Sequence, residues 1–111
     1  MGLKSFFGVL YARVVKQQNK WWIKNPIKSQ EKVFASLISQ ASETVFGKEH
    51  DFKHVRSYED FKSKVPVRDY EGLKIYIEST LEGEENILWP GRPLYFCKTS
   101  GTTSGTKYIP I

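Results

Sequence analysis

Apolar side chains recur every three or four positions through the first half of the chain, which is the spacing of helices with one buried face. Near the N-terminus the repeating residues are Leu3, Phe6, Phe7, Leu10, Val14 and Trp21. A second set follows the dipeptide Asn25–Pro26 and comprises Ile27, Phe34, Leu37, Ile38, Ala41 and Val45. We expect one helix through the first set. A second should begin at Pro26, with Asn25 as its cap and Gly47 as its end.

Two shorter helices are predicted from capping residues further along the chain. In the stretch "SYED", Ser57 stands three residues before Asp60, which is the spacing of a helix cap. This helix should end before Pro66, because the residue before a proline disfavours the helical conformation. Asp69 can cap the next helix, which Gly83 should end. The residues expected to face inward from that helix are Tyr70, Leu73, Ile77 and Leu81.

The pattern changes near the C-terminus, where turn-forming residues separate two short apolar stretches. "WPGRP" is typical of a bend, and the large side chains of Leu94 to Cys97 predict a buried strand. "KYIPI" predicts a second strand, in which Pro110 indicates an edge or irregular position. No internal repeat interrupts this order. The sequence therefore predicts an α+β fold of three to four helices followed by one β-hairpin.

The net positive charge of the chain belongs to its N-terminal segment. The first 30 residues contain no acid, and their bases are Lys4, Arg13, Lys16, Lys20, Lys24 and Lys28, in a chain whose net charge is +5. Arg13, Lys16 and Lys20 lie opposite the apolar arc of the first helix. Such a helix can lie on an anionic membrane or enter a partner's groove. We interpret it instead as a surface helix docked by its apolar face, and expect no membrane contact by residues 1–24 and no nucleic-acid partner.

Composition narrows the class of protein further. The chain is 40% hydrophobic, and no apolar run approaches the roughly 20 residues that a membrane span needs. Its lone cysteine, Cys97, cannot form an internal disulfide, so we expect a reducing compartment, the cytoplasm, and a small buried side chain at this position. His50 and His54 lack the further ligands of a zinc site and are expected to be surface histidines, so no metal site is predicted.

The polar loop between the two expected strands carries the candidate chemistry. "TSGTTSGTK", Thr99 to Lys107, combines glycine backbone amides, six hydroxyl groups and one exit lysine. Many donors, few bulky groups and one cation suit a polyphosphate. The spacing does not fit a Walker-type loop, which has four residues between its glycines, Lys-Ser/Thr directly after the second glycine, and a helix next. The alternative is a plain hairpin turn rich in Ser, Thr and Gly.

The loop resembles the phosphate-binding motif of the adenylate-forming superfamily, Thr-Ser-Gly-Thr-Thr-Gly-x-Pro-Lys-Gly. Three positions depart from that motif, namely Ser104, Thr106 and Tyr108. The departures indicate the auxin-responsive acyl acid–amido synthetase family (Gretchen Hagen three). The stretches "FGKEHDFKHVRSYEDFKSKVPVRDYEGLKIYIE" and "ILWPGRPLYF" are also similar to that family, and bacterial members look closest. The resemblance extends from about Asn25 onward.

The resemblance implies an α/β adenylate-forming synthetase fold, of which residues 1–111 would be the N-terminal segment of the large adenylation domain. It implies a two-step ligase that uses ATP and Mg²⁺ to adenylate a carboxylic acid and then joins the acyl group to an amine or amino acid. The implied ATP-binding residues are Thr99, Ser100, Gly101, Thr102, Thr103, Ser104, Gly105 and Lys107. No catalytic residue is assigned. We expect a fragment that is inactive alone, because the later nucleotide motifs are missing.

Two other interpretations stay open at this point. One is a different adenylate-forming ligase, such as an acyl-CoA or acyl-protein synthetase, in which a thiol accepts the acyl group. The other is a non-catalytic binding module that uses the basic amphipathic N-terminal helix, with the polar loop incidental.

Overall fold

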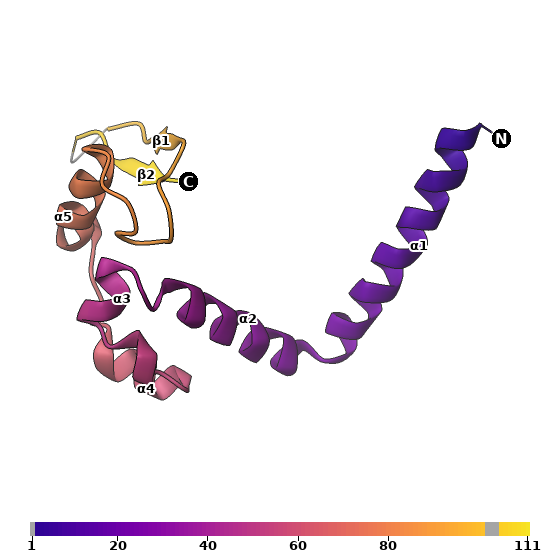
Figure 1. The fold of residues 1–111 in the computed structure, drawn as a ribbon, viewed down its shortest axis with the longest axis horizontal. Coiled ribbons are helices and arrows are strands. Elements are labelled where there is room, and N and C mark those ends of the chain that lie inside the picture. Colours follow the sequence, from indigo (N-terminus) through magenta and orange to yellow (C-terminus); the bar gives the residue numbers. More distant parts are fainter. Residues whose placement is uncertain (1, 102–104) are drawn as a thin grey trace. The chain divides into compact units, whose positions relative to one another are not determined.

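The computed structural model describes residues 2–101 and 105–111 and divides the chain into two compact units. The first comprises residues 1–35 and the second residues 36–111. The elements, in chain order, are α1 (Leu3–Lys24), α2 (Pro26–Ala41), α3 (Val45–Glu49), the 3-10 helix η1 (Phe52–His54), α4 (Tyr58–Lys64), α5 (Tyr70–Leu81), β1 (Phe96–Lys98) and β2 (Tyr108–Pro110) (Figure 1). The predicted order of helices followed by one hairpin is confirmed, but the described residues form five α-helices and one 3-10 helix where three to four helices were predicted.

The first unit consists of α1 and the beginning of α2. Asn25 has φ −131° and ψ 58°, which ends α1, and its side-chain amide donates to the Trp21 carbonyl at 2.9 Å. The prediction that α2 begins at Pro26 is confirmed, but the Asn25 side chain acts on the preceding helix rather than on the following one. Among the helices that the structure describes, none is both long and apolar enough to cross a membrane.

The predicted second helix is interrupted, so the expectation that it runs to Gly47 is wrong. α2 ends at Ala41, and Thr44 then caps the short α3 by accepting from the Gly47 N–H at 3.0 Å. The Thr44 hydroxyl also donates to the Ala41 carbonyl at 2.7 Å. Gly47 is buried inside α3, where a Cβ atom would lie 1.9 Å from the Ala41 carbonyl oxygen. Glycine is needed here for close backbone approach and not for ending a helix.

The two capped helices that the sequence predicted are confirmed. Asp60 and Ser57 form a capping box, in which the Asp60 N–H donates to Ser57 Oγ at 3.1 Å and the Ser57 N–H donates to Asp60 Oδ2 at 3.0 Å. Asp69 accepts from the Gly72 N–H at 2.9 Å at the start of α5. Gly83 follows α5 with φ +96°, the left-handed conformation that glycine adopts readily.

The core of the second unit lies around α3, η1 and α5. Its buried apolar side chains are Ile38, Ala41, Phe52, Val55, Ile77 and Ile87. Of the four residues expected to face inward from α5, Ile77 is buried, Tyr70 and Leu73 are half-buried, and Leu81 is exposed. His50 is buried and stacks on Phe46 with ring centroids 4.1 Å apart, so the prediction of a surface histidine is wrong at this position.

The segment between α5 and β1 is anchored on α3 through the backbone. The first two N–H groups of α3, on Val45 and Phe46, donate to the carbonyls of Asn86 and Ile87 at 2.9 and 3.0 Å. These N–H groups have no partner within their own helix, so the segment satisfies them. Asn86 has φ +58°, and its side chain accepts from the Gly91 N–H at 2.8 Å. The predicted bend is thereby fixed against the helical core.

The two strands form an antiparallel pair that lies next to α5 (Figure 1). In its register Phe96 faces Pro110, Cys97 faces Ile109 and Lys98 faces Tyr108. The strand pair and the place of Pro110 within it were predicted correctly. The prediction that the first strand and Cys97 are buried is wrong: Leu94 is 81% exposed and Cys97 is exposed. Side chains on one face of a two-stranded ribbon are buried only when another element packs against that face. Among the described residues, no element packs over Leu94 or Cys97.

Lowering the pH should remove part of the stability that Asp51 contributes. Asp51 has φ +53° and accepts from Lys64 Nζ at 2.5 Å and from His54 Nδ1 at 2.6 Å. Both hydrogen bonds hold the pKa of the Asp51 carboxyl below its usual range, and the bond from Lys64 has the larger effect. A lowered folded-state pKa means that the contribution is full above the ordinary carboxyl pKa and is lost as pH falls through the lowered value.

The measurement is the melting temperature of the parent and of Asp51→Asn between pH 6 and pH 2. Asparagine tolerates the same left-handed conformation, so the variant isolates the charge. We expect the parent to be more stable at pH 6 and the two to converge as the Asp51 carboxyl becomes protonated. Glu82→Gln, at the exposed end of α5, serves as the control and should not show that convergence. A constant difference across the range would contradict the role of the Asp51 charge.

Candidate functional site

The base of the candidate phosphate loop is closed by two hydrogen bonds just beyond the two strands. The Thr99 N–H donates to the Lys107 carbonyl at 2.9 Å, and the Lys107 N–H donates to the Thr99 hydroxyl at 3.2 Å. These two bonds join the first and last residues of the predicted loop. The structure therefore brings Thr99 and Lys107 together, as a hairpin that presents one loop requires.

The two glycines of the loop have different structural reasons. A Cβ on Gly101 would lie 2.6 Å from the Gly105 carbonyl carbon and 2.8 Å from the Thr106 nitrogen, so the two sides of the loop approach each other closely there. Gly105 has φ +82°, which favours glycine, and nothing would contact its Cβ. Both glycines are thus needed for the backbone path, Gly101 because the opposite side of the loop fills its Cβ position and Gly105 because of its positive φ, and only Gly105 has open space beside it.

The polar groups of the described part of the loop are open to solvent. Thr99, Ser100, Gly101, Gly105 and Thr106 are exposed, whereas Lys107 is half-buried. Three of the predicted ATP-binding residues, Thr102, Thr103 and Ser104, lie outside the described residues. Exposed hydroxyls, uncovered backbone and one lysine beside them form a donor set that suits an anionic ligand with several oxygen atoms.

Lys107 is held against α5 rather than extended freely. Its Nζ atom lies 5.4 Å from the centroid of the Tyr70 ring, within the range of a cation–π interaction. Tyr70 is the first residue of α5, and its hydroxyl accepts from the Tyr108 N–H at 2.9 Å. The sequence predicted Tyr70 only as an inward-facing side chain. Its contact with the loop exit links residues 38 positions apart, which no local pattern indicates.

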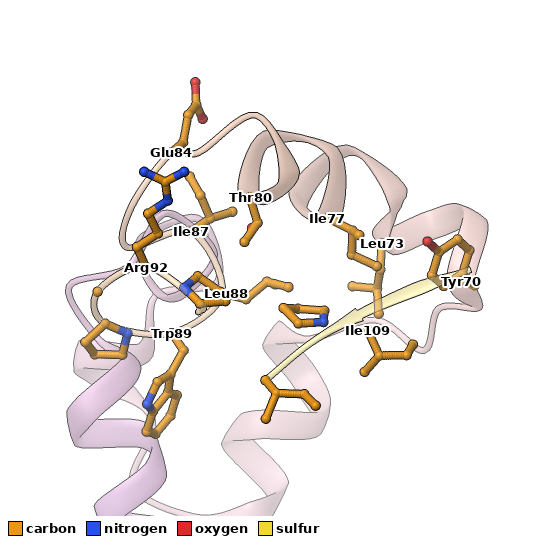
Figure 2. Close-up of a pocket in the computed structure, with 15 residues that line it drawn as sticks. Tyr70, Leu73, Ile77, Thr80, Glu84, Ile87, Leu88, Trp89, Arg92 and Ile109 are labelled. Carbon is orange, nitrogen blue, oxygen red and sulfur yellow. The ribbon is translucent and has the colours of Figure 1, made fainter. Parts of the chain in front are cut away.

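A cavity of about 500 Å³, which Tyr70 also lines, offers different chemistry. Figure 2 shows its walls, formed by side chains of α5, of the 84–93 segment and of β2. They are mainly apolar, with Leu73, Ile77, Leu88, Trp89 and Ile109 prominent among them. An apolar cavity suits the hydrocarbon part of a ligand, whereas phosphates need the donors of the hairpin loop. The loop is therefore the better candidate for a polyphosphate.

The described residues offer little for direct metal binding. No three His, Cys, Asp or Glu side chains cluster as a metal site among residues 2–101 and 105–111. His54, one of the two histidines considered from the sequence, is exposed and bonds Asp51, while buried His50 contacts the Phe46 carbonyl through Nδ1 at 2.8 Å. The two histidines are therefore not part of a shared set of metal ligands among the described residues.

Comparison with known proteins gives one family and several relatives. The GH3 family N-terminal domain matches residues 16–111. The chain is 35% identical over 87 residues to indole-3-acetic acid-amido synthetase GH3.4 of Arabidopsis thaliana. The aligned region covers 78% of this chain and 15% of the relative. It is 35% identical to GH3.2 of the same plant, over 78% of this chain and 16% of the relative.

A rice protein extends this similarity. The chain is 29% identical over 81 residues to the probable indole-3-acetic acid-amido synthetase GH3.2 of Oryza sativa subsp. japonica, which is 72% of this chain and 13% of the relative. The chain thus spans about 15% of the length of the curated relatives that it matches. No solved structure gave a significant match. These relatives are plant proteins, and the resemblance to bacterial members stays a prediction.

Proposed function

Because the chain belongs to the GH3 family, we propose that the whole protein is an ATP-dependent ligase that adenylates a carboxylic acid and conjugates it to an amine. The relatives are named as synthetases that join indole-3-acetic acid through an amide. The family assignment favours this reaction over that of a thiol-accepting ligase or of a non-catalytic binding module. Residues 1–111 would contribute the first phosphate-binding segment of the large adenylation domain, within an α/β adenylate-forming fold.

One structural observation supports the proposal, namely the hairpin loop closed by Thr99 and Lys107. In the proposed reaction the acid attacks the α-phosphate of ATP, and pyrophosphate leaves with an acyl-adenylate remaining. An amine then displaces AMP and forms the amide. Negative charge gathers on the leaving pyrophosphate, and fixed donors stabilise charge best where it develops. The exposed loop donors are suited to that position, and Lys107 supplies the positive charge.

The residues that would hold the triphosphate are those of the predicted site. Hydroxyls of Thr99, Ser100, Thr102, Thr103 and Ser104 would donate to phosphate oxygens. The open space beside Gly105 would allow close approach to the backbone, and Gly101 would permit the tight path of the loop. Mg²⁺, when bound with ATP, would neutralise phosphate charge, since it prefers phosphate oxygens and water over all-protein cages. The donor set of the loop fits such a ligand, because it supplies hydrogen-bond donors and one cation. We also place the reaction in the cytoplasm, as expected for ATP chemistry with a free thiol at Cys97.

The test is acid-dependent exchange of labelled pyrophosphate into ATP by the whole protein. Exchange that requires a small carboxylic acid and proceeds without an amine would support adenylation as the first step. Adding an amino acid should then give an amide and AMP, whereas adding coenzyme A should give no thioester. Absence of exchange with every acid offered, indole-3-acetic acid included, would contradict the proposal. Thioester formation would instead show that the protein is a thiol-accepting ligase.

A further inference from the structure

Tyr70 lies outside the loop but is bonded to the residue that follows it. The Tyr108 N–H donates to the Tyr70 hydroxyl at 2.9 Å, and that hydroxyl donates to the Tyr108 carbonyl at 3.4 Å. One side chain from the first turn of α5 thus satisfies both backbone groups of the first residue of β2. Such a double contact fixes the backbone of β2 directly after Lys107.

The geometry of the hairpin explains why Tyr108 is available to Tyr70. In an antiparallel pair, the backbone N–H and carbonyl groups of every second residue bond the partner strand, and those of the residues in between point away from it. The Thr99 N–H bonds the Lys107 carbonyl, and the Ile111 N–H bonds the Tyr95 carbonyl, so these pairs face each other across the ladder. Tyr108 therefore directs its N–H and carbonyl toward the outer edge of β2. The Tyr70 hydroxyl stands there in place of a neighbouring strand.

The same tyrosine also contacts the lysine side chain. Lys107 Nζ lies 5.4 Å from the Tyr70 ring centroid, and both side chains are half-buried. A lysine on a flexible stem loses much rotamer freedom when it binds a phosphate, and a ring that already limits its positions reduces that loss. Tyr70 thus acts on Lys107 twice, through the backbone that follows it and through its ammonium group.

We propose that Tyr70 is a positioning residue that holds Lys107 ready for the triphosphate of ATP. This inference rests on the proposed function of the loop. The contacts of Tyr70 with the loop exit are those to Tyr108 and Lys107, so its proposed effect passes through these two residues. That dependence distinguishes it from a residue that merely supports the fold, because most of the effect of its removal should be lost once Lys107 has been replaced.

The first measurement is the kinetics of pyrophosphate exchange in the whole protein with Tyr70→Phe and Tyr70→Leu. Phenylalanine keeps the ring beneath Lys107 and removes the hydroxyl, and we expect the KM for ATP to rise roughly 3- to 10-fold, as for one lost hydrogen bond. Leucine removes both contacts and should raise it further, roughly 10- to 50-fold. The KM for the acid should stay unchanged. The matched control is Tyr58→Leu, since Lys62 Nζ lies 4.9 Å from the Tyr58 ring at an exposed site away from the loop.

A double-mutant cycle then tests whether Tyr70 acts through Lys107. If it does, adding Tyr70→Leu to Lys107→Ala should lower kcat/KM for ATP by less than about 2-fold beyond the loss caused by Lys107→Ala alone. Independent, multiplying losses would overturn the inference and leave Tyr70 a structural residue. Should Lys107→Ala alone retain the parent KM and kcat, the assignment of the loop to ATP fails, and the positioning role of Tyr70 fails with it.

A readout without nucleotide separates the two failures. Amide hydrogen exchange of the peptide that contains Tyr108, measured in the whole protein, should be faster in Tyr70→Phe than in the parent. The reason is that the Tyr108 N–H loses its acceptor. In Tyr58→Leu the exchange rate should match that of the parent. Unchanged exchange in Tyr70→Phe would overturn the anchor itself, whatever the ATP kinetics show.

Discussion

Replacing Lys107 by alanine should slow acyl-adenylate formation in the whole protein about 10²- to 10³-fold, the effect of losing one donor to a developing charge. Lys107 is the cation at the loop exit, and its ammonium is already held beside the hairpin by the Tyr70 ring. The measurement is the rate of acid-dependent pyrophosphate exchange at saturating acid. Transfer of a preformed acyl-adenylate to the amine should be unaffected, because pyrophosphate has left by then.

Lys62→Ala is the matched control for this experiment. Lys62 also carries its charge over a tyrosine ring, but it lies on α4 and away from the loop. The control removes a lysine charge over a tyrosine ring, together with an exposed ion pair to Glu59 at 2.8 Å, and it should keep exchange near the parent rate. If Lys107→Ala exchanged pyrophosphate like the parent while changing the preferred amine, the loop would belong to the acceptor and not to ATP.

Gly47→Ala is expected to destabilise the second unit by about 3 kcal/mol or more. The added Cβ would lie 1.9 Å from the Ala41 carbonyl oxygen and 2.9 Å from its carbon. Both atoms belong to the backbone, so no rotamer change relieves the clash and α3 must move. The movement would also disturb the Thr44 cap, whose oxygen accepts from the Gly47 N–H. Chemical denaturation followed by circular dichroism measures the loss.

The same substitution at Gly8 provides the comparison. Gly8 lies inside α1, and nothing would lie within 4 Å of its Cβ. There alanine should stabilise the helix by roughly 0.5–1 kcal/mol, because it restricts the unfolded chain more than glycine does. Equal effects at the two positions would show that Gly47 is not in close contact with the end of α2.

Local chemistry explains which elements the sequence predicted well. The capping box of Ser57 and Asp60, the Asp69 cap and the left-handed Gly83 each depend on atoms within a few residues of one another. Such signals act before tertiary packing and can be identified from spacing alone. Pro110 also helped to predict β2, because a proline at this position excluded a helix there.

Long-range contacts explain what the sequence missed. α2 ends at Ala41 because Thr44 and the carbonyls of Asn86 and Ile87 together satisfy the start of a new helix, and a period of apolar residues cannot reveal that. The apolar run before Lys98 predicted burial from hydrophobicity, but burial needs a covering element. For the candidate site, the sequence identified the loop residues from their composition, whereas Tyr70 entered only through a contact between distant positions.

The pairing of Thr99 with Lys107 has a consequence for the thermodynamics of ligand binding. Joining the ends of a flexible loop has an entropic cost that grows with its length. In this hairpin the ends are joined by two hydrogen bonds as part of folding, so that cost belongs to the free energy of the fold and not to that of association. A change in β1 or β2 that loosens the pairing would transfer the cost to binding. Affinity would then fall although every donor remained in place.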